Sequence, residues 1–209
     1  MIEVSPFDPT SEALVIVVAG EEALREQLRN VLRAARIEML ALKSAAALSS
    51  RNLPDRPGCL VIHVQAQEPD AQELWAWVVE SERKLPIVLV AAPDELPIAE
   101  RALMAAAVDL LLMPVRDEDA IDAIESAISQ DTERRKFIRE NRSLVATLNA
   151  YEAEVMAEML KGLLNRQIAH KLAIGETAVK IHRGNIMRKM KAVSIADLAR
   201  KIASIKTDR

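Results

Sequence analysis

The sequence predicts an α/β domain built on a five-stranded parallel sheet, followed by an all-helical domain. Up to about residue 129, short runs of apolar, β-branched residues alternate with helical spacing, and beyond residue 149 the spacing is helical only. The charge changes sign at the same place. Residues 1–149 hold 16 Lys and Arg against 25 Asp and Glu, a balance of −9, whereas residues 150–209 hold 12 against six, a balance of +6. The 209 residues therefore divide into two domains with different tasks.

The first domain is predicted strand by strand. Burial of both faces of a parallel sheet gives continuous apolar runs instead of alternation. Such runs lie at 14–18, 60–64, 87–90 and 108–112, with a weaker one at 37–42. Apolar residues at helical spacing lie between and after them, at 21–35, 71–82, 97–106 and 118–129. This order predicts a doubly wound sheet with its ligand site at the carboxyl ends of the strands.

A linker helix is predicted after the last of these segments. Helical spacing continues through a broken apolar stripe that includes Ile138 and Val145. We interpret 1–129 as the first domain, 130–147 as a linker helix that can form a dimer seam, and 148–209 as the second domain. A helix packed on its own sheet, followed by a solvated charged connector, fits the linker pattern equally well.

The second domain begins with a helix-start signal. Asn149 lies three residues before Glu152, the spacing of a capping box, and Gly162 can end this helix in the left-handed conformation. A short helix at 165–172, a turn at 173–175 and a longer helix at 176–191 follow, and Ser194 and Asp197 cap a fourth helix.

The helix at 176–191 is amphipathic and basic. A buried stripe is predicted for Val179, His182, Ile186 and Met190, while the basic residues project towards solvent or phosphate. A short helix, a tight turn and a basic amphipathic helix predict a helix-turn-helix.

Composition excludes several other classes of protein. The apolar run 13–19 is too short to cross a bilayer and the acidic start does not resemble a signal peptide, so we expect a cytoplasmic protein without a membrane partner. Cys59 is the single cysteine, the three histidines are scattered, and the five glycines cannot form a nucleotide-binding loop. We expect no metal site, no cofactor and no enzymatic activity. Aromatic residues make up 2% of the chain, which argues against recognition of single strands.

The second domain resembles a known family. The residues that carry the resemblance are the run 163–169, Ile174, the run 179–182 and the run 185–190. Over 148–205, the sequence closely resembles the LuxR-type helix-turn-helix of FixJ/NarL-like two-component response regulators. The resemblance implies that 176–191 is a recognition helix in the major groove of double-stranded DNA. It implies DNA contacts from Thr177, Lys180, Ile181, Arg183, Arg188 and Lys189, with Lys180, Ile181 and Arg183 nearest the bases and Arg188 and Lys189 towards the backbone. Ala178 and Gly184 depart from the family pattern, so a weaker or differently specific site is expected.

The first domain resembles the receiver of the same family, a flavodoxin-like fold, at 15–25, 56–61, 85–88 and 105–115. A receiver forms an aspartyl phosphate with a nucleophilic carboxylate, two acids that hold Mg²⁺, a hydroxyl and a lysine. The resemblance places other residues in these roles: Ala19 and Gly20 at the acidic pair, His63 at the phosphoacceptor, Ala91 at the hydroxyl, Met113 at the lysine and Leu110 at the aromatic switch. Glu21 and Glu22 do not substitute, because the family already has acids there. We therefore expect a degenerate phosphorylation pocket and a pseudo-receiver.

Three residues of the first domain have two interpretations each. His63 at a strand end is expected to be hydrogen-bonded, with phosphohistidine as the less favoured reading. Cys59 is expected to be a core side chain and not a redox sensor. Trp75 and Trp77 lie two apart on a predicted helix, so at least one is expected to be exposed, where it can contact a partner.

The expected function is a DNA-binding transcriptional regulator, an atypical response regulator that aspartyl phosphorylation does not control. It is expected to bind paired half-sites as a homodimer. The alternative is an adaptor or anti-regulator that binds a histidine kinase or another regulator through its pseudo-receiver. RNA antitermination is the least favoured hypothesis, because the chain lacks aromatic residues for loop recognition.

Overall fold

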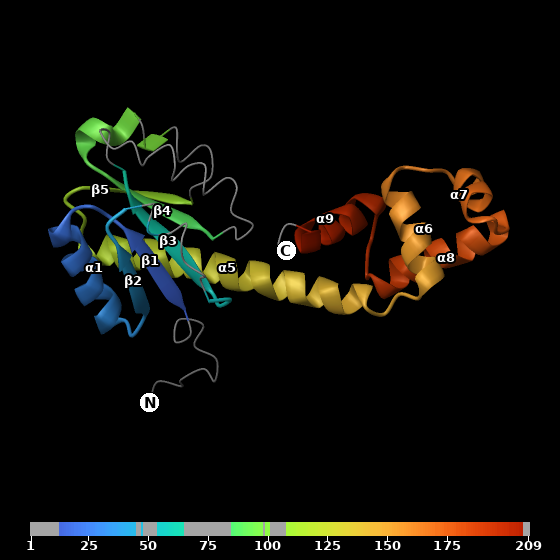
Figure 1. Cartoon of the computed structure of the whole chain (residues 1–209), viewed down its shortest axis with the longest axis horizontal. Helices are drawn as coiled ribbons and strands as arrows, with labels where there is room; N and C mark the ends of the chain where they lie inside the picture. Colours follow the sequence, from blue (N-terminus) through green and yellow to red (C-terminus); the bar gives the residue numbers. More distant parts are fainter. Residues whose placement is uncertain are drawn as a thin grey trace. The chain divides into compact units, whose positions relative to one another are not determined.

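The computed structural model describes residues 13–44, 47, 54–64, 85–97, 99–100 and 108–206. The chain divides into two compact units, Met1–Arg135 and Lys136–Arg209 (Figure 1). We call them the sheet unit and the helical unit. Within the described ranges, no helix is both long enough and apolar enough to cross a membrane.

The sheet unit contains the predicted five-stranded parallel sheet. Its strands are β1 (Leu14–Val18), β2 (Glu38–Leu42), β3 (Gly58–His63), β4 (Ile87–Ala91) and β5 (Asp109–Leu112). All neighbours pair in parallel, in the order β2-β1-β3-β4-β5. The fold class expected from the sequence is confirmed. β3 begins two residues earlier than predicted, at Gly58, which pairs with Leu14 of β1.

Two helices cover one face of this sheet, α1 (Glu22–Ala34) and α5 (Asp117–Val145), as Figure 1 shows. Their apolar stripes pack on alternate strand residues such as Val17, Val61 and Val90, which form one continuous core. A second core on the other face includes Ile16, Ile62 and Leu89. The predicted helix 71–82 with Trp75 and Trp77, and most of the predicted helix 97–106, lie outside the described residues.

Cys59 lies inside the first of these cores and is fully buried. Burial, together with the nearby carboxylate of Asp131, raises the pKa of its thiol to about 12. Because the thiolate is the reactive form of cysteine, this environment supports a packing role for Cys59.

Helix α5 continues without a break through most of the range interpreted as a linker and ends at Val145. Its second half contributes to the helical unit, where Leu144 and Val145 pack against the core and Ile138 is 3% exposed. Part of the apolar stripe is therefore covered within the unit itself.

The helical unit also contains α6 (Ala150–Leu160), α7 (Asn165–Leu172), α8 (Glu176–Lys189) and α9 (Ile195–Lys206). The predicted capping box is present: Asn149 Oδ1 accepts from Glu152 N at 2.8 Å, and Glu152 Oε2 accepts from Asn149 N at 2.9 Å. Gly162 follows α6 with φ +82°, as predicted. α8 ends two residues earlier than expected, because Lys191 has a positive φ.

Candidate functional site

Helices α7 and α8 form the predicted helix-turn-helix. Between them, Ala173 adopts the left-handed conformation with φ 52°, and Gly175 is the extended N-cap of α8. The two helices share one core with α6 and α9, to which α8 contributes Val179 and Ile186 and its C-cap contributes Met190, all fully buried. His182, predicted on the same stripe, is partly buried and stacks on Tyr151 at 6.1 Å between ring centroids.

The side of α8 opposite this core is exposed. One helix face carries four exposed residues that are spaced by four, three and four positions: Thr177, Ile181, Gly184 and Arg188. Lys180 lies beside them, and its ammonium is 3.9 Å from the carboxylate of Glu176. Because both side chains are at least half exposed, this ion pair holds Lys180 only weakly. We call these five residues the α8 outer face.

Arg183 and Lys189 do not belong to the α8 outer face. Arg183 lies nearer to the buried side of the helix and is partly buried. The ammonium of Lys189 donates to Glu152 Oε2 at 2.6 Å and to the carbonyl of Thr147 at 3.0 Å. Of the six predicted DNA-contacting residues, the structure therefore brings four together and places two at the flanks.

Internal ion pairs are the feature that the sequence analysis missed here. Glu152 is 2% exposed and, in addition to its capping role, holds Lys189, which lowers the pKa of the Glu152 carboxyl. Glu158 accepts from Lys171 at 2.8 Å and from Lys161 at 2.9 Å, and both lower its pKa. The pair between Glu158 and Lys161 has helical spacing that the sequence shows. The pairs to Lys171 and Lys189 join different helices and need the fold.

The carboxyl ends of the strands form the second candidate site. Ala19 directly follows β1, His63 ends β3, Ala91 ends β4 and Met113 directly follows β5, with Met113 N donating to Ala91 O at 2.9 Å. These positions, together with Gly20, therefore lie at one edge of the sheet, which we call the carboxyl edge. Leu110 lies earlier in β5, opposite Leu89, and packs on the second core.

Arg25 is an unpredicted member of the carboxyl edge. From α1, its Nη1 atom donates to the carbonyl of Ala19 at 2.7 Å and to the carbonyl of Gly20 at 2.6 Å. The residue is 7% exposed. A buried positive charge therefore lies against the backbone of the two residues that the receiver resemblance aligns with the acidic pair.

His63 is also enclosed, with a side chain that is 6% exposed. Its Nε2 atom is 4.0 Å from Glu95 Oε2, and within the described residues its buried Nδ1 atom has no hydrogen-bond partner. Glu95 Oε2 also accepts from Ala92 N at 2.9 Å, so this carboxylate caps the short helix η1 (Pro93–Glu95). At 4.0 Å, His63 Nε2 and Glu95 Oε2 are too far apart for a hydrogen bond.

The carboxyl edge does not fit the Mg²⁺ of a receiver. Mg²⁺ prefers carboxylate oxygens in an octahedral arrangement, and the residues that the receiver resemblance aligns with the acidic pair are Ala19 and Gly20. Glu21 and Glu22 are exposed at the start of α1. The guanidinium of Arg25 repels a second cation. No group of three or more His, Cys, Asp or Glu side chains within the described ranges could hold a metal ion.

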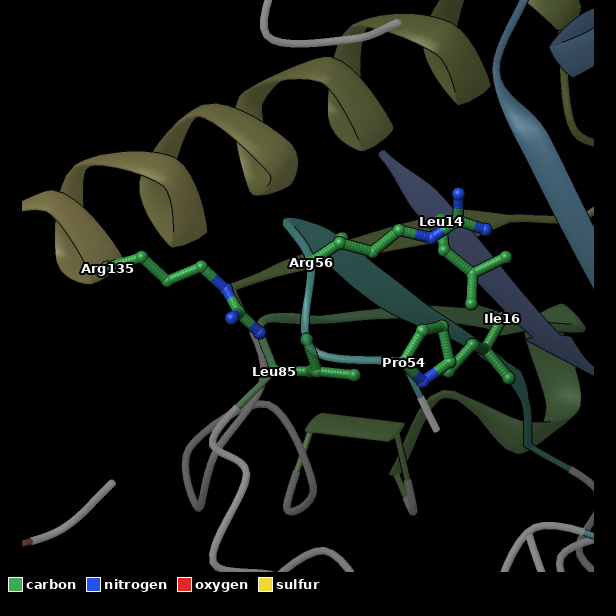
Figure 2. A pocket seen from close by; sticks show the side chains of 7 residues that line it. Leu14, Ile16, Pro54, Arg56, Leu85 and Arg135 are labelled. Carbon is green, nitrogen blue, oxygen red and sulfur yellow. The ribbon is translucent and has the colours of Figure 1, made fainter. Parts of the chain in front are cut away.

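A small cavity lies at the opposite, amino-terminal edge of the sheet, where Leu14 and Gly58 begin their strands. Figure 2 shows Arg135 reaching from α5 towards Leu85 and Pro54. The cavity volume is about 10 Å³, room for a single water molecule. It is too small for an organic ligand.

Comparison with known proteins identifies both units. The family "Bacterial regulatory proteins, luxR family" matches residues 146–202. The chain is 33% identical over 196 residues to "Nodulation protein W" of Bradyrhizobium diazoefficiens, covering 92% of this chain and 86% of that protein. It is 29% identical over 189 residues to "Transcriptional regulatory protein FixJ" of Azorhizobium caulinodans, covering 89% and 90%.

A solved structure agrees over nearly the whole chain. The response regulator StyR is 32% identical, with a TM-score of 0.59 and coverage of 92% of this chain and 98% of that one. The match spans the receiver fold as well as the helix-turn-helix. The chain therefore belongs to the FixJ/NarL-type response regulators and is a transcriptional regulator with a LuxR-type DNA-binding domain.

Proposed function

We propose that the α8 outer face enters the major groove of double-stranded DNA and that two copies of the chain bind paired half-sites. The observation that carries this proposal is the composition of that face. Ile181 is apolar and yet 59% exposed, and it lies between Lys180 and Arg188 on a helix whose other side is fully packed. Cations meet phosphates, and an apolar side chain meets the methyl groups and edges of bases.

A salt titration of duplex binding tests this proposal. The logarithm of the affinity should fall linearly with the logarithm of the salt concentration, because binding releases counterions. Lys180→Ala should make the slope shallower by about one. Lys206→Ala, which removes an exposed cation of α9, should leave the slope unchanged. Absence of duplex binding at low salt would instead favour the adaptor that binds a kinase or another regulator.

We further infer that the sheet unit is a pseudo-receiver that aspartyl phosphorylation does not control. The receiver resemblance aligns His63 with the phosphoacceptor, and the carbonyls of Ala19 and Gly20 already have a cation, the guanidinium of Arg25. A phosphoryl group bound there would lack both its nucleophile and its metal. Regulation then depends on the amount of protein or on a protein partner.

Incubation with acetyl phosphate and Mg²⁺ tests the pseudo-receiver. The intact mass should remain unchanged, while a receiver with its aspartate and acidic pair, treated in parallel, gains one phosphoryl group. A phosphoryl adduct on the wild-type chain would contradict the proposal. Its loss in His63→Ala would identify phosphohistidine as the species formed.

A further inference from the structure

Gly184 is an interior residue of α8, the helix Glu176–Lys189. Glycine disfavours a helix interior more than any residue except proline, because it loses the most backbone freedom on folding. A glycine at this position therefore needs a reason in the packing, in the backbone conformation or in a molecule that approaches the helix.

The described part of the chain supplies neither of the first two reasons. Gly184 lies within an α-helix and is not among the residues with a positive φ. Apart from its two chain neighbours and the backbone of its own helix, a Cβ atom added there would have no heavy atom within 4 Å in the described structure. Gly58 is the contrasting case, because a Cβ at that position would lie 2.1 Å from the carbonyl oxygen of Leu14.

The position of Gly184 points to the third reason. It lies on the α8 outer face, between Ile181 and Arg188, and opposite the buried residues Val179 and Ile186. A helix with its side chains is about 10 to 12 Å wide and the major groove is about 12 Å wide, so side chains set how deeply a helix can enter. Where a side chain is missing, backbone atoms can approach a ligand closely.

We propose that Gly184 is a positioning residue that lets the backbone of α8 approach the base edges closely, so that the neighbouring Ile181 and Arg188 reach the DNA. This inference rests on the proposed function. It is the opposite of the interpretation that Gly184 is a lost contact. If Gly184 is a lost contact, adding a side chain there should leave DNA affinity unchanged or increase it. If Gly184 permits close approach, adding a side chain should decrease DNA affinity.

The test separates stability from affinity in the intact chain. Duplexes that the wild-type protein selects from a random pool serve as the probe, with a scrambled duplex beside them. In Gly184→Ala, amide exchange of α8 should slow about four- to fivefold, because alanine favours the helix. Affinity for the selected duplex should fall about tenfold, the size of one good base contact. Gly184→Leu, also a helix former, should lose more.

Ser143→Ala is the matched control, since it increases helix propensity at an exposed position of α5. It should leave DNA affinity unchanged. Affinity of the scrambled duplex, which depends on charge, should be the same for all variants. Unchanged affinity of Gly184→Ala for the selected duplex would overturn this inference alone. A wild-type chain that binds no duplex would overturn the proposed function and this inference together.

Discussion

At the scale of single residues, buried charges that were not visible in the sequence organise both units. Asp131 has no exposed surface and accepts from Arg135 Nε at 2.7 Å, Arg134 Nη2 at 2.8 Å and Gly58 N at 3.1 Å. It thereby ties α5 to the first residue of β3. The pairs with Arg134 and Arg135 have helical spacing, but the contact with Gly58 spans 73 residues and could not be predicted from a local pattern.

We expect Asp131→Ala to lower the free energy of unfolding of the sheet unit by about 3 to 5 kcal/mol, because it removes one partner from a buried ion pair. Asp55→Ala is the control, since Asp55 also pairs with Arg135 but its side chain is 83% exposed. Its effect should stay below about 1 kcal/mol. Urea unfolding followed by circular dichroism and amide exchange measures both. Equal effects of the two substitutions would contradict the assignment.

The helical unit should lose stability in acid. Glu152 and Glu158 have pKa values below the ordinary 4.5, chiefly because of hydrogen bonds from Lys189 and from Lys171. A carboxyl whose pKa is lower in the folded state stabilises the fold above its unfolded pKa, and this contribution is lost as the pH falls through the folded value. Below about pH 4.5, hydrogen exchange of the α6 and α8 amides should therefore accelerate by more than the intrinsic effect of pH on exchange.

Glu152→Gln provides the matching variant for this titration. Glutamine can preserve the capping box with Asn149 but carries no charge for Lys189. The loss of stability at acid pH should be smaller in this variant than in the wild-type chain. An unchanged pH profile would show that the ion pair with Lys189 contributes nothing to it.

At the scale of elements, the most predictable features were the helix ends that a capping side chain or a glycine marks. The Asn149 capping box and the left-handed Gly162 were both read from the sequence, and α7 has the predicted bounds. At the helix-turn-helix, the exposed α8 residues followed from helical spacing. The early start of β3 depends on Gly58, where any Cβ would collide with Leu14. The role of Arg25 depends on how α1 faces the carboxyl edge, which periodicity does not determine.

Two left-handed residues give opposite predictions. Gly162 has φ +82° and Ala173 has φ 52°. Because a Cβ is disfavoured in this conformation by roughly 1 to 2 kcal/mol, Gly162→Ala should destabilise the helical unit by about 1 kcal/mol. Ala173→Gly should stabilise it by about 0.5 kcal/mol, since the added freedom of the unfolded chain offsets part of the gain. Thermal unfolding of the intact chain compares the two. A shift in the same direction for both would contradict this explanation.

At the scale of the whole molecule, the division of charge predicts two units, and the structure divides the chain at Arg135 and Lys136. The fold class was predicted correctly because buried parallel strands and basic amphipathic helices have strong sequence patterns. The sequence predicted that helical spacing continues past residue 129, but not that the second half of α5 packs on the core of the helical unit, since the apolar stripe of α5 changes partners midway.

Binding to paired half-sites predicts a dependence on DNA phase. Two recognition helices on one face of the duplex require half-sites about 10 base pairs apart. Inserting about five base pairs between the half-sites should abolish joint binding, and inserting about ten should restore most of it. Gel-shift titration and light scattering of the complexes measure this. Identical affinity for all three spacings would indicate that each copy binds independently.

The carboxylates of Glu152 and Glu158 also bear on how the charge of the helical unit is counted. Lys161, Lys171 and Lys189 face anions that the protein itself provides, so they already have counter-charges before any nucleic acid arrives. Fewer small ions are displaced from the duplex than the twelve basic residues at 150–209 would suggest. The number of counterions released on DNA binding is therefore determined by the fold and not by composition.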